Sequence, residues 1–189
     1  MKSTWHEFFL DNLTLPNLLS AFRLLLTPVF ILLFLRVQTP AQYYYTVTLA
    51  AILALSDLAD GWIARRYHQV TDLGKFLDPL SDKLLQAALL FCLGTRYPLV
   101  WVLSGVFVVK EGALALAALL LLRQTGRKLD GAKWWGKCST ALLYAALFLL
   151  LAFPRLSPAV VQALLYLCMA ALFASGVLYA LLYRRLWRR

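Results

Sequence analysis

The chain has 189 residues, of which 62% are hydrophobic and only 15% charged, whereas a soluble globular domain carries about 25% charged residues. This composition excludes an ordinary soluble domain and predicts a membrane protein. The formal net charge of +10 would suit nucleic acid, but the basic residues are spread between apolar segments instead of covering one compact domain. We therefore expect a lipid bilayer, and no nucleic acid, as the partner of this charge.

The first segment, residues 1–14, has the pattern of a short amphipathic helix. Thr4 and Glu7 have the spacing of a capping box. Trp5, Phe8 and Phe9 fall on one side of the helix that would follow. Helices of this kind lie in the membrane interface. We predict a short interfacial helix here.

Six apolar runs follow, separated by short polar breaks. A helix of about 20 apolar residues spans the hydrocarbon core. Backbone groups must be hydrogen-bonded there, and the period-2 pattern of a membrane barrel is missing. The predicted fold is therefore all-α, a polytopic membrane protein whose six transmembrane helices form one bundle over residues 17–183 within a single domain, 1–189. The predicted spans are 17–37, 42–66, 75–95, 98–122, 136–153 and 157–183.

The distribution of positive charge predicts the orientation of this bundle. Of the 19 Lys and Arg residues, Arg36, Arg96 and Arg155 fall on the side opposite the N-terminus, and Arg23 and Lys110 lie inside predicted spans. The rest lie on the side of the N-terminus. Because cytoplasmic segments carry the excess of Lys and Arg, both termini are expected in the cytoplasm.

Acidic residues gather at the junction of the second and third spans. Asp57 and Asp60 are three residues apart, and Asp78 and Asp82 are four apart, so each pair shares one face of its helix. Helices joined by a short connection are antiparallel neighbours, which allows the two pairs to converge. Asp72 does not fit this pattern and is expected to cap the third span.

Four carboxylates that face one another at a membrane edge would repel strongly unless cations lie between them. Oxygen ligands without a histidine or thiolate favour Mg²⁺ or Mn²⁺. Gly61, Ala64 and Gly74 leave room for a phosphorylated group near the backbone, and Arg65 offers a guanidinium fork for phosphate. The alternative, solvated helix ends paired with nearby Lys and Arg, does not explain these small residues. The pattern predicts a site for a metal-bound pyrophosphate.

The string D-x-x-D-G-x-x-A-R-x8-G-x3-D-x3-D, from Asp57 to Asp82, matches the signature of the CDP-alcohol phosphatidyltransferases at every defined position. The chain resembles that family over nearly its whole length. The resemblance implies an enzyme of the cell (inner or plasma) membrane, often a homodimer, that transfers a phosphatidyl group from CDP-diacylglycerol to an alcohol and releases CMP. It implies that the four aspartates bind two divalent ions and that Asp82 is also the general base. The residues that it implies for the CDP pocket are Gly61, Ala64, Arg65 and Gly74.

Residues outside the signature are expected to recognise the acceptor. Asn17, just after a proline that starts the first span, is predicted at the mouth of the CDP pocket. Arg23 and Lys110 lie inside spans, where a lone cation is costly unless it faces a polar cavity. Glu111 should point about 100° away from Lys110 and be a poor partner for it. We expect Arg23, Lys110 and Lys137 to form a site for an anionic acceptor. Lys137 also fits the alternative of a lysine snorkelling at a membrane edge nearly as well.

The opening at 16–23, the stretch 74–83 and the Gly136-Lys137-x-x-Thr140 segment resemble bacterial phosphatidylglycerophosphate synthases, which implies glycerol 3-phosphate as acceptor. Lys110-Glu111 departs from the Arg-Glu of that subgroup. A second alternative is a CMP-forming cardiolipin synthase, with phosphatidylglycerol as acceptor. An ion or solute carrier is an alternative of another class, but carriers usually show internal repeats or broken helices, and neither is evident here.

Overall fold

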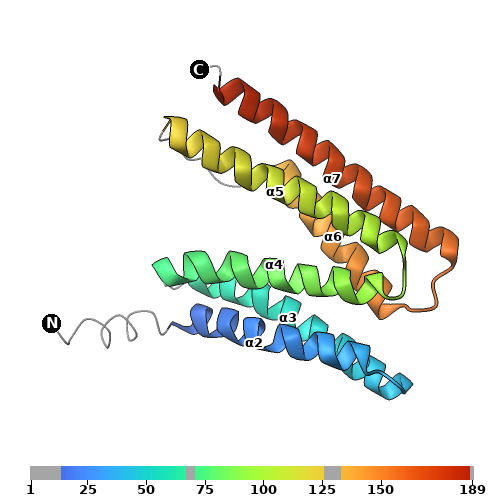
Figure 1. Ribbon diagram of the computed structural model, residues 1–189. Helices are drawn as coiled ribbons and strands as arrows, with labels where there is room; N and C mark the ends of the chain where they lie inside the picture. Colours follow the sequence, from blue (N-terminus) through green and yellow to red (C-terminus); the bar gives the residue numbers. More distant parts are fainter. Residues whose placement is uncertain (1–13, 67–70, 126–132, 188–189) are drawn as a thin grey trace. The chain divides into compact units, whose positions relative to one another are not determined.

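The computed structural model describes the backbone of residues 14–66, 71–125 and 133–187, and within these ranges it describes all side chains except those of 57–65, 72, 75, 125 and 185–187. In this part of the chain every regular element is an α-helix (Figure 1). The predicted interfacial helix lies outside the described residues. The helices are α2 (Leu15–Leu35), α3 (Pro40–Arg66), α4 (Asp72–Gly94), α5 (Leu99–Thr125), α6 (Trp134–Ala152) and α7 (Pro158–Trp187).

Four of the described helices are long and apolar enough to cross a membrane: α2, α5, α6 and α7. Their outward side chains fit lipid, since Leu25, Val109 and Phe173 are 71%, 71% and 70% exposed. The helices α3 and α4 carry the acidic motif at the ends that face their connection, which shortens their apolar stretches. The all-helical membrane fold is therefore confirmed, while the crossing of the bilayer by α3 and α4 stays a prediction.

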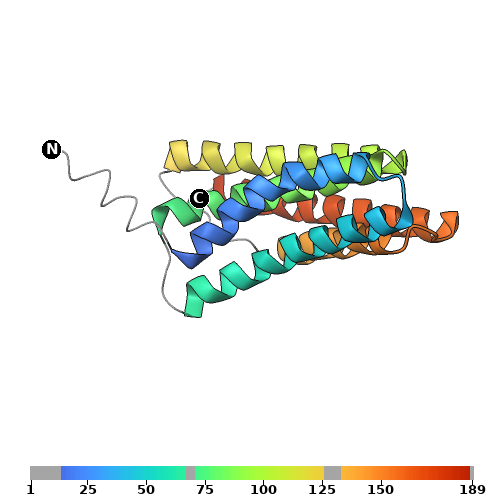
Figure 2. The same ribbon diagram turned by 90° about the horizontal axis from the view of Figure 1, so that it is seen from below.

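The chain divides into two compact units, of which the first is Met1–Cys92. In it α2 and α3 run antiparallel and side by side (Figures 1 and 2). Aromatic side chains fill the space between them near their connection: Phe34 lies 6.1 Å from Phe30 and 6.4 Å from Tyr43, measured between ring centroids. The helix α4 runs parallel to α2. This unit carries the whole acidic motif.

The second unit is Leu93–Arg189, in which α7 packs along both α5 and α6. The helices α5 and α7 run in the same direction, and α6 runs against them (Figure 1). Leu121, Tyr179 and Tyr183 form a buried cluster, against which Trp135 of α6 also packs. The sequence predicted a single domain, and this stays a prediction because the chain divides into two compact units.

Candidate active site

The start of α4 is fixed by a threonine. The Oγ1 of Thr71, the residue before the helix, accepts a hydrogen bond from the backbone N–H of Gly74 at 3.0 Å. A threonine hydroxyl at the N-cap satisfies one of the N–H groups that the first turn leaves unpaired. The expectation that Asp72 caps this helix was therefore wrong by one residue, because Asp72 is already the first residue of α4.

Asn17 joins α2 to this cap. Its Nδ2 donates a hydrogen bond to Thr71 Oγ1 at 2.8 Å. Its Oδ1 lies where a side chain at Gly74 would begin, since a Cβ added to Gly74 would be only 2.5 Å from that oxygen. A glycine at position 74 thus lets the Asn17 amide approach the first turn of α4. Both predicted CDP-pocket residues in this part of the site lie together.

Asp78 is bound to α2 one turn further along. The hydroxyl of Ser20 donates a hydrogen bond of 2.7 Å to Asp78 Oδ1, and Ser20 is fully buried. Sequence reasoning missed Ser20, because a serine in an apolar helix ordinarily bonds its own backbone. Its spacing of three residues after Asn17 was the one available signal, since it places Ser20 on the same buried stripe of α2.

Asp82 follows Asp78 by four residues on α4, and both side chains are partly buried. The spacing predicted for this pair is therefore realised on a continuous helix. Among the described residues no three acidic, histidine or cysteine side chains gather as metal ligands. The donors that α4 does present are oxygens only, which fit a hard divalent cation.

The other half of the motif lies near the end of α3. The backbone at Asp57 and Asp60 is helical, as predicted, and so is the backbone at the small and basic residues that follow. The side chains of these residues lie outside the described part. Their convergence with the α4 aspartates therefore stays a prediction. The residues concerned are Asp57, Asp60, Gly61, Ala64 and Arg65.

Arg23 is the largest polar side chain buried in α2, at 0% exposure. It continues the stripe formed by Asn17 and Ser20, one turn further into the helix. The hydroxyl of Thr27 donates a hydrogen bond of 2.7 Å to the Arg23 carbonyl, just before the proline at position 28. Arg23 is therefore held in the interior of the first unit, in line with the two residues that contact α4.

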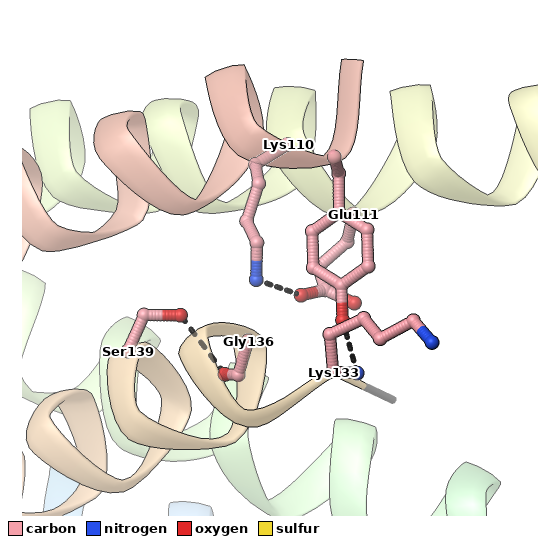
Figure 3. A network of polar contacts seen from close by, with 6 residues as sticks. Lys110, Glu111, Lys133, Gly136 and Ser139 are labelled. Atoms are coloured by element: carbon pink, nitrogen blue, oxygen red, sulfur yellow. Dashed lines mark hydrogen bonds and ion pairs between the residues drawn. The ribbon is translucent and has the colours of Figure 1, made fainter. Parts of the chain in front are cut away.

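Lys110 has a partner that sequence reasoning rejected. Its Nζ lies 2.9 Å from Glu111 Oε1, and the two side chains are only 6% and 27% exposed (Figure 3). The expectation failed because both side chains are long and flexible, so they bend toward each other although their Cα–Cβ bonds diverge. A cation inside an apolar helix thereby obtains a counter-charge.

Lys110 also lines a groove between α5 and α7. The groove has a volume of about 1260 Å³ and is lined chiefly by apolar and small residues, among them Gly105 and Gly176. The Lys110 chain passes close to α7 at Gly176, where an added Cβ would lie in ordinary van der Waals contact, 3.7 Å from Lys110 Cγ. Arg184 also lines it. Lys110 and Arg184 are thus the charged residues of a chiefly apolar lining.

The start of α6 is held by α7 through a tyrosine. The hydroxyl of Tyr179 accepts a hydrogen bond of 2.9 Å from the backbone N–H of Lys133. Gly136 makes room for this ring, since an added Cβ would lie 2.5 Å from the tyrosine oxygen. Lys137, the next residue, is exposed. Gly136 thus has a packing role, while Lys137 stays available to a ligand.

The chain is similar to a known enzyme family over most of its length. The family model described as CDP-alcohol phosphatidyltransferase matches residues 13–178. A CDP-diacylglycerol–glycerol-3-phosphate 3-phosphatidyltransferase of Pseudomonas fluorescens is 35% identical over 147 residues, covering 75% of this chain and 74% of the relative. The enzyme of the same name from Escherichia coli K12 is 31% identical over 144 residues, covering 75% and 79%. A cardiolipin synthase (CMP-forming) of Streptomyces coelicolor is 36% identical over 142 residues, covering 74% and 66%.

The match to the family model spans the helices that hold Asn17, Ser20 and Asp78 as well as the complete acidic motif. The acidic motif, the helical membrane fold and the similar proteins all indicate the same family. The chain belongs to the CDP-alcohol phosphatidyltransferase family, whose members are enzymes.

Proposed function

We propose that this enzyme transfers a phosphatidyl group from CDP-diacylglycerol to glycerol 3-phosphate and releases CMP. Two relatives named for glycerol 3-phosphate support this acceptor. The similarity covers about three quarters of the length of each relative. The observation that carries the proposal is the acidic motif on α3 and α4, because its last two aspartates have the predicted helical spacing and Asp78 is held by a buried hydroxyl.

In the proposed reaction a hydroxyl oxygen of the acceptor attacks the phosphorus that carries the diacylglycerol. A new P–O bond forms, the bond from this phosphorus to the oxygen of CMP breaks, and CMP leaves. Asp82 takes the proton of the attacking hydroxyl, as a carboxylate within hydrogen-bond reach does in general base catalysis. No covalent intermediate with the protein is needed.

Two divalent ions, Mg²⁺ or Mn²⁺, are proposed to be held by the four aspartates of the motif: Asp57, Asp60, Asp78 and Asp82. A bound divalent cation neutralises charge on the pyrophosphate oxygens and on the developing transition state. The oxygen-only donors of α4 are consistent with such ions. The carboxylates would otherwise repel each other, so the cation also supports the assembled site.

The substrate pockets are proposed from charge and position. Arg65 pairs with phosphate of the CDP group, and the small residues at its side leave room for the nucleotide. Arg23, Lys110 and Lys137 are proposed for the phosphate of the acceptor. Of these, Lys137 is exposed, whereas Arg23 and Lys110 are buried. The nucleotide pocket is proposed to be lined by Asn17, Gly61, Ala64 and Gly74.

A second acceptor is favoured by one comparison. The relative from Streptomyces coelicolor is named as a CMP-forming cardiolipin synthase and is as similar as the others. The same CDP-lipid half of the reaction would then serve phosphatidylglycerol. The two candidates differ only in the alcohol.

The deciding experiment gives purified protein CDP-diacylglycerol, Mg²⁺ or Mn²⁺, and either glycerol 3-phosphate or phosphatidylglycerol, and measures CMP and the lipid product. We expect CMP and phosphatidylglycerophosphate with the first acceptor and no cardiolipin with the second. Cardiolipin with phosphatidylglycerol, and no product with glycerol 3-phosphate, would establish the second candidate. No CMP with any alcohol would refute the reaction.

The enzyme is further proposed to be a homodimer of the cell membrane with both termini and the acidic motif on the cytoplasmic side. The excess of Lys and Arg on the side of the N-terminus supports this orientation. A reporter that is active only in the cytoplasm, fused after residue 189, should be active. An inactive reporter in a fusion that retains transferase activity would contradict the proposed orientation.

A further inference from the structure

Ser20 Oγ lies within hydrogen-bond distance of an Asp78 oxygen and of the Pro16 carbonyl oxygen, and these two distances differ. Its Oγ lies 2.7 Å from Asp78 Oδ1 and 3.2 Å from the Pro16 carbonyl oxygen. A serine hydroxyl has one hydrogen to donate. The shorter distance is that of a charge-assisted hydrogen bond to a carboxylate, whereas the longer one is the weak bond that serines in helices usually make. The bond that Ser20 donates to Asp78 is therefore the stronger of these two.

The burial of Ser20 restricts the orientation of its hydroxyl group. Ser20 is 0% exposed in the middle of the buried stripe of α2, so its short side chain has few alternative orientations. Asn17, one turn earlier, is bonded to Thr71 at the cap of α4. Two hydrogen bonds, from residues three apart on α2, thus reach Thr71, the residue before α4, and Asp78 on α4. They hold this stretch of α2 beside the first turns of α4.

We infer that Ser20 is a positioning residue of the metal site, whose hydroxyl binds one oxygen of Asp78 and thereby orients the other toward the divalent cation. This inference rests on the proposed function, which makes Asp78 a metal ligand. Groups that hydrogen-bond a metal ligand restrict its rotation and fix its orientation. Their removal costs about 10- to 100-fold in metal affinity or activity.

The test uses Mn²⁺ as probe and purified full-length protein. Ser20→Ala removes the hydroxyl, and Ser20→Thr retains one. The matched control is Ser139→Ala, since Ser139 is also buried in a helix but its hydroxyl bonds only the Gly136 carbonyl, at 2.9 Å. Mn²⁺ affinity is measured by the electron paramagnetic resonance signal of the free ion, and thermal unfolding without metal is measured for each variant.

We expect Ser20→Ala to bind Mn²⁺ about tenfold more weakly or worse, with thermal unfolding close to that of Ser139→Ala, and Ser20→Thr to restore most of the affinity. The Mg²⁺ concentration needed for half-maximal transfer should rise in the same order. Wild-type Mn²⁺ affinity in Ser20→Ala would overturn the inference. Wild-type protein that transfers without any divalent ion, or binds none, would instead refute the proposed metal site itself.

Discussion

The contact between Gly136 and Tyr179 allows a stability prediction with a matched control. In Gly136→Ala the new methyl group would lie 2.5 Å from the Tyr179 oxygen, and 2.9 and 3.1 Å from two of its ring carbons. A phenol ring cannot bend away as a flexible side chain can. Tyr179 is only 6% exposed, and the Trp135 ring lies 5.9 Å from it between centroids. The ring or the helix must therefore move.

The expected cost follows from three contributions. Overpacking of a filled site costs about 1–3 kcal/mol. A displaced Tyr179 also weakens its bond to the Lys133 N–H, a net loss of about 1 kcal/mol. Alanine in place of glycine in a helix returns about 1 kcal/mol. We therefore expect a net loss of about 1–3 kcal/mol of stability, and a fall of several degrees in the midpoint of thermal unfolding.

Tryptophan fluorescence during heating in detergent measures this midpoint. The control is Gly112→Ala on α5, because an added Cβ there meets nothing within 4 Å; its midpoint should equal or exceed that of wild type. Tyr179→Phe removes the oxygen nearest to the new methyl, so adding it to Gly136→Ala should cost less than the two single changes together. An unfolding midpoint for Gly136→Ala at or above that of Gly112→Ala would refute the packing role.

Three other predictions concern the charged residues. Asp82→Asn should abolish CMP release while leaving unfolding near wild type, because the amide cannot take the proton of the acceptor; turnover near wild type would remove Asp82 from its role. Arg23→Gln should raise the KM for glycerol 3-phosphate more than the KM for CDP-diacylglycerol, and equal effects on both would contradict acceptor binding. Glu111→Gln should cost about 1–3 kcal/mol of stability, because it leaves the buried Lys110 without its counter-charge. Lys110→Met in the same chain should recover most of that loss, and a loss that persists would show that the pair is not responsible.

The sequence alone determined where the helices lie and which acids form the motif. Each predicted span overlaps a helix of the structure, with ends that differ by at most a few residues. This succeeds because helix formation depends on neighbouring residues, and because the bilayer sets the length of an apolar run. The spacing of Asp78 and Asp82 on one helix follows from the same local periodicity. The enzyme family could be predicted because the string from Asp57 to Asp82 matches the signature of that family.

The tertiary structure alone decided which side chains meet. Ser20 and Asp78 are 58 positions apart, Asn17 and Thr71 are 54 apart, and Lys133 and Tyr179 are 46 apart. No local pattern encodes such pairs, because they depend on how one helix is rotated against another and on which buried polar groups find partners. Lys110 and Glu111 are neighbours, and even their pairing depended on side-chain rotamers in an apolar wall. A polar group buried among apolar helices needs a partner, and only the packed helices select it.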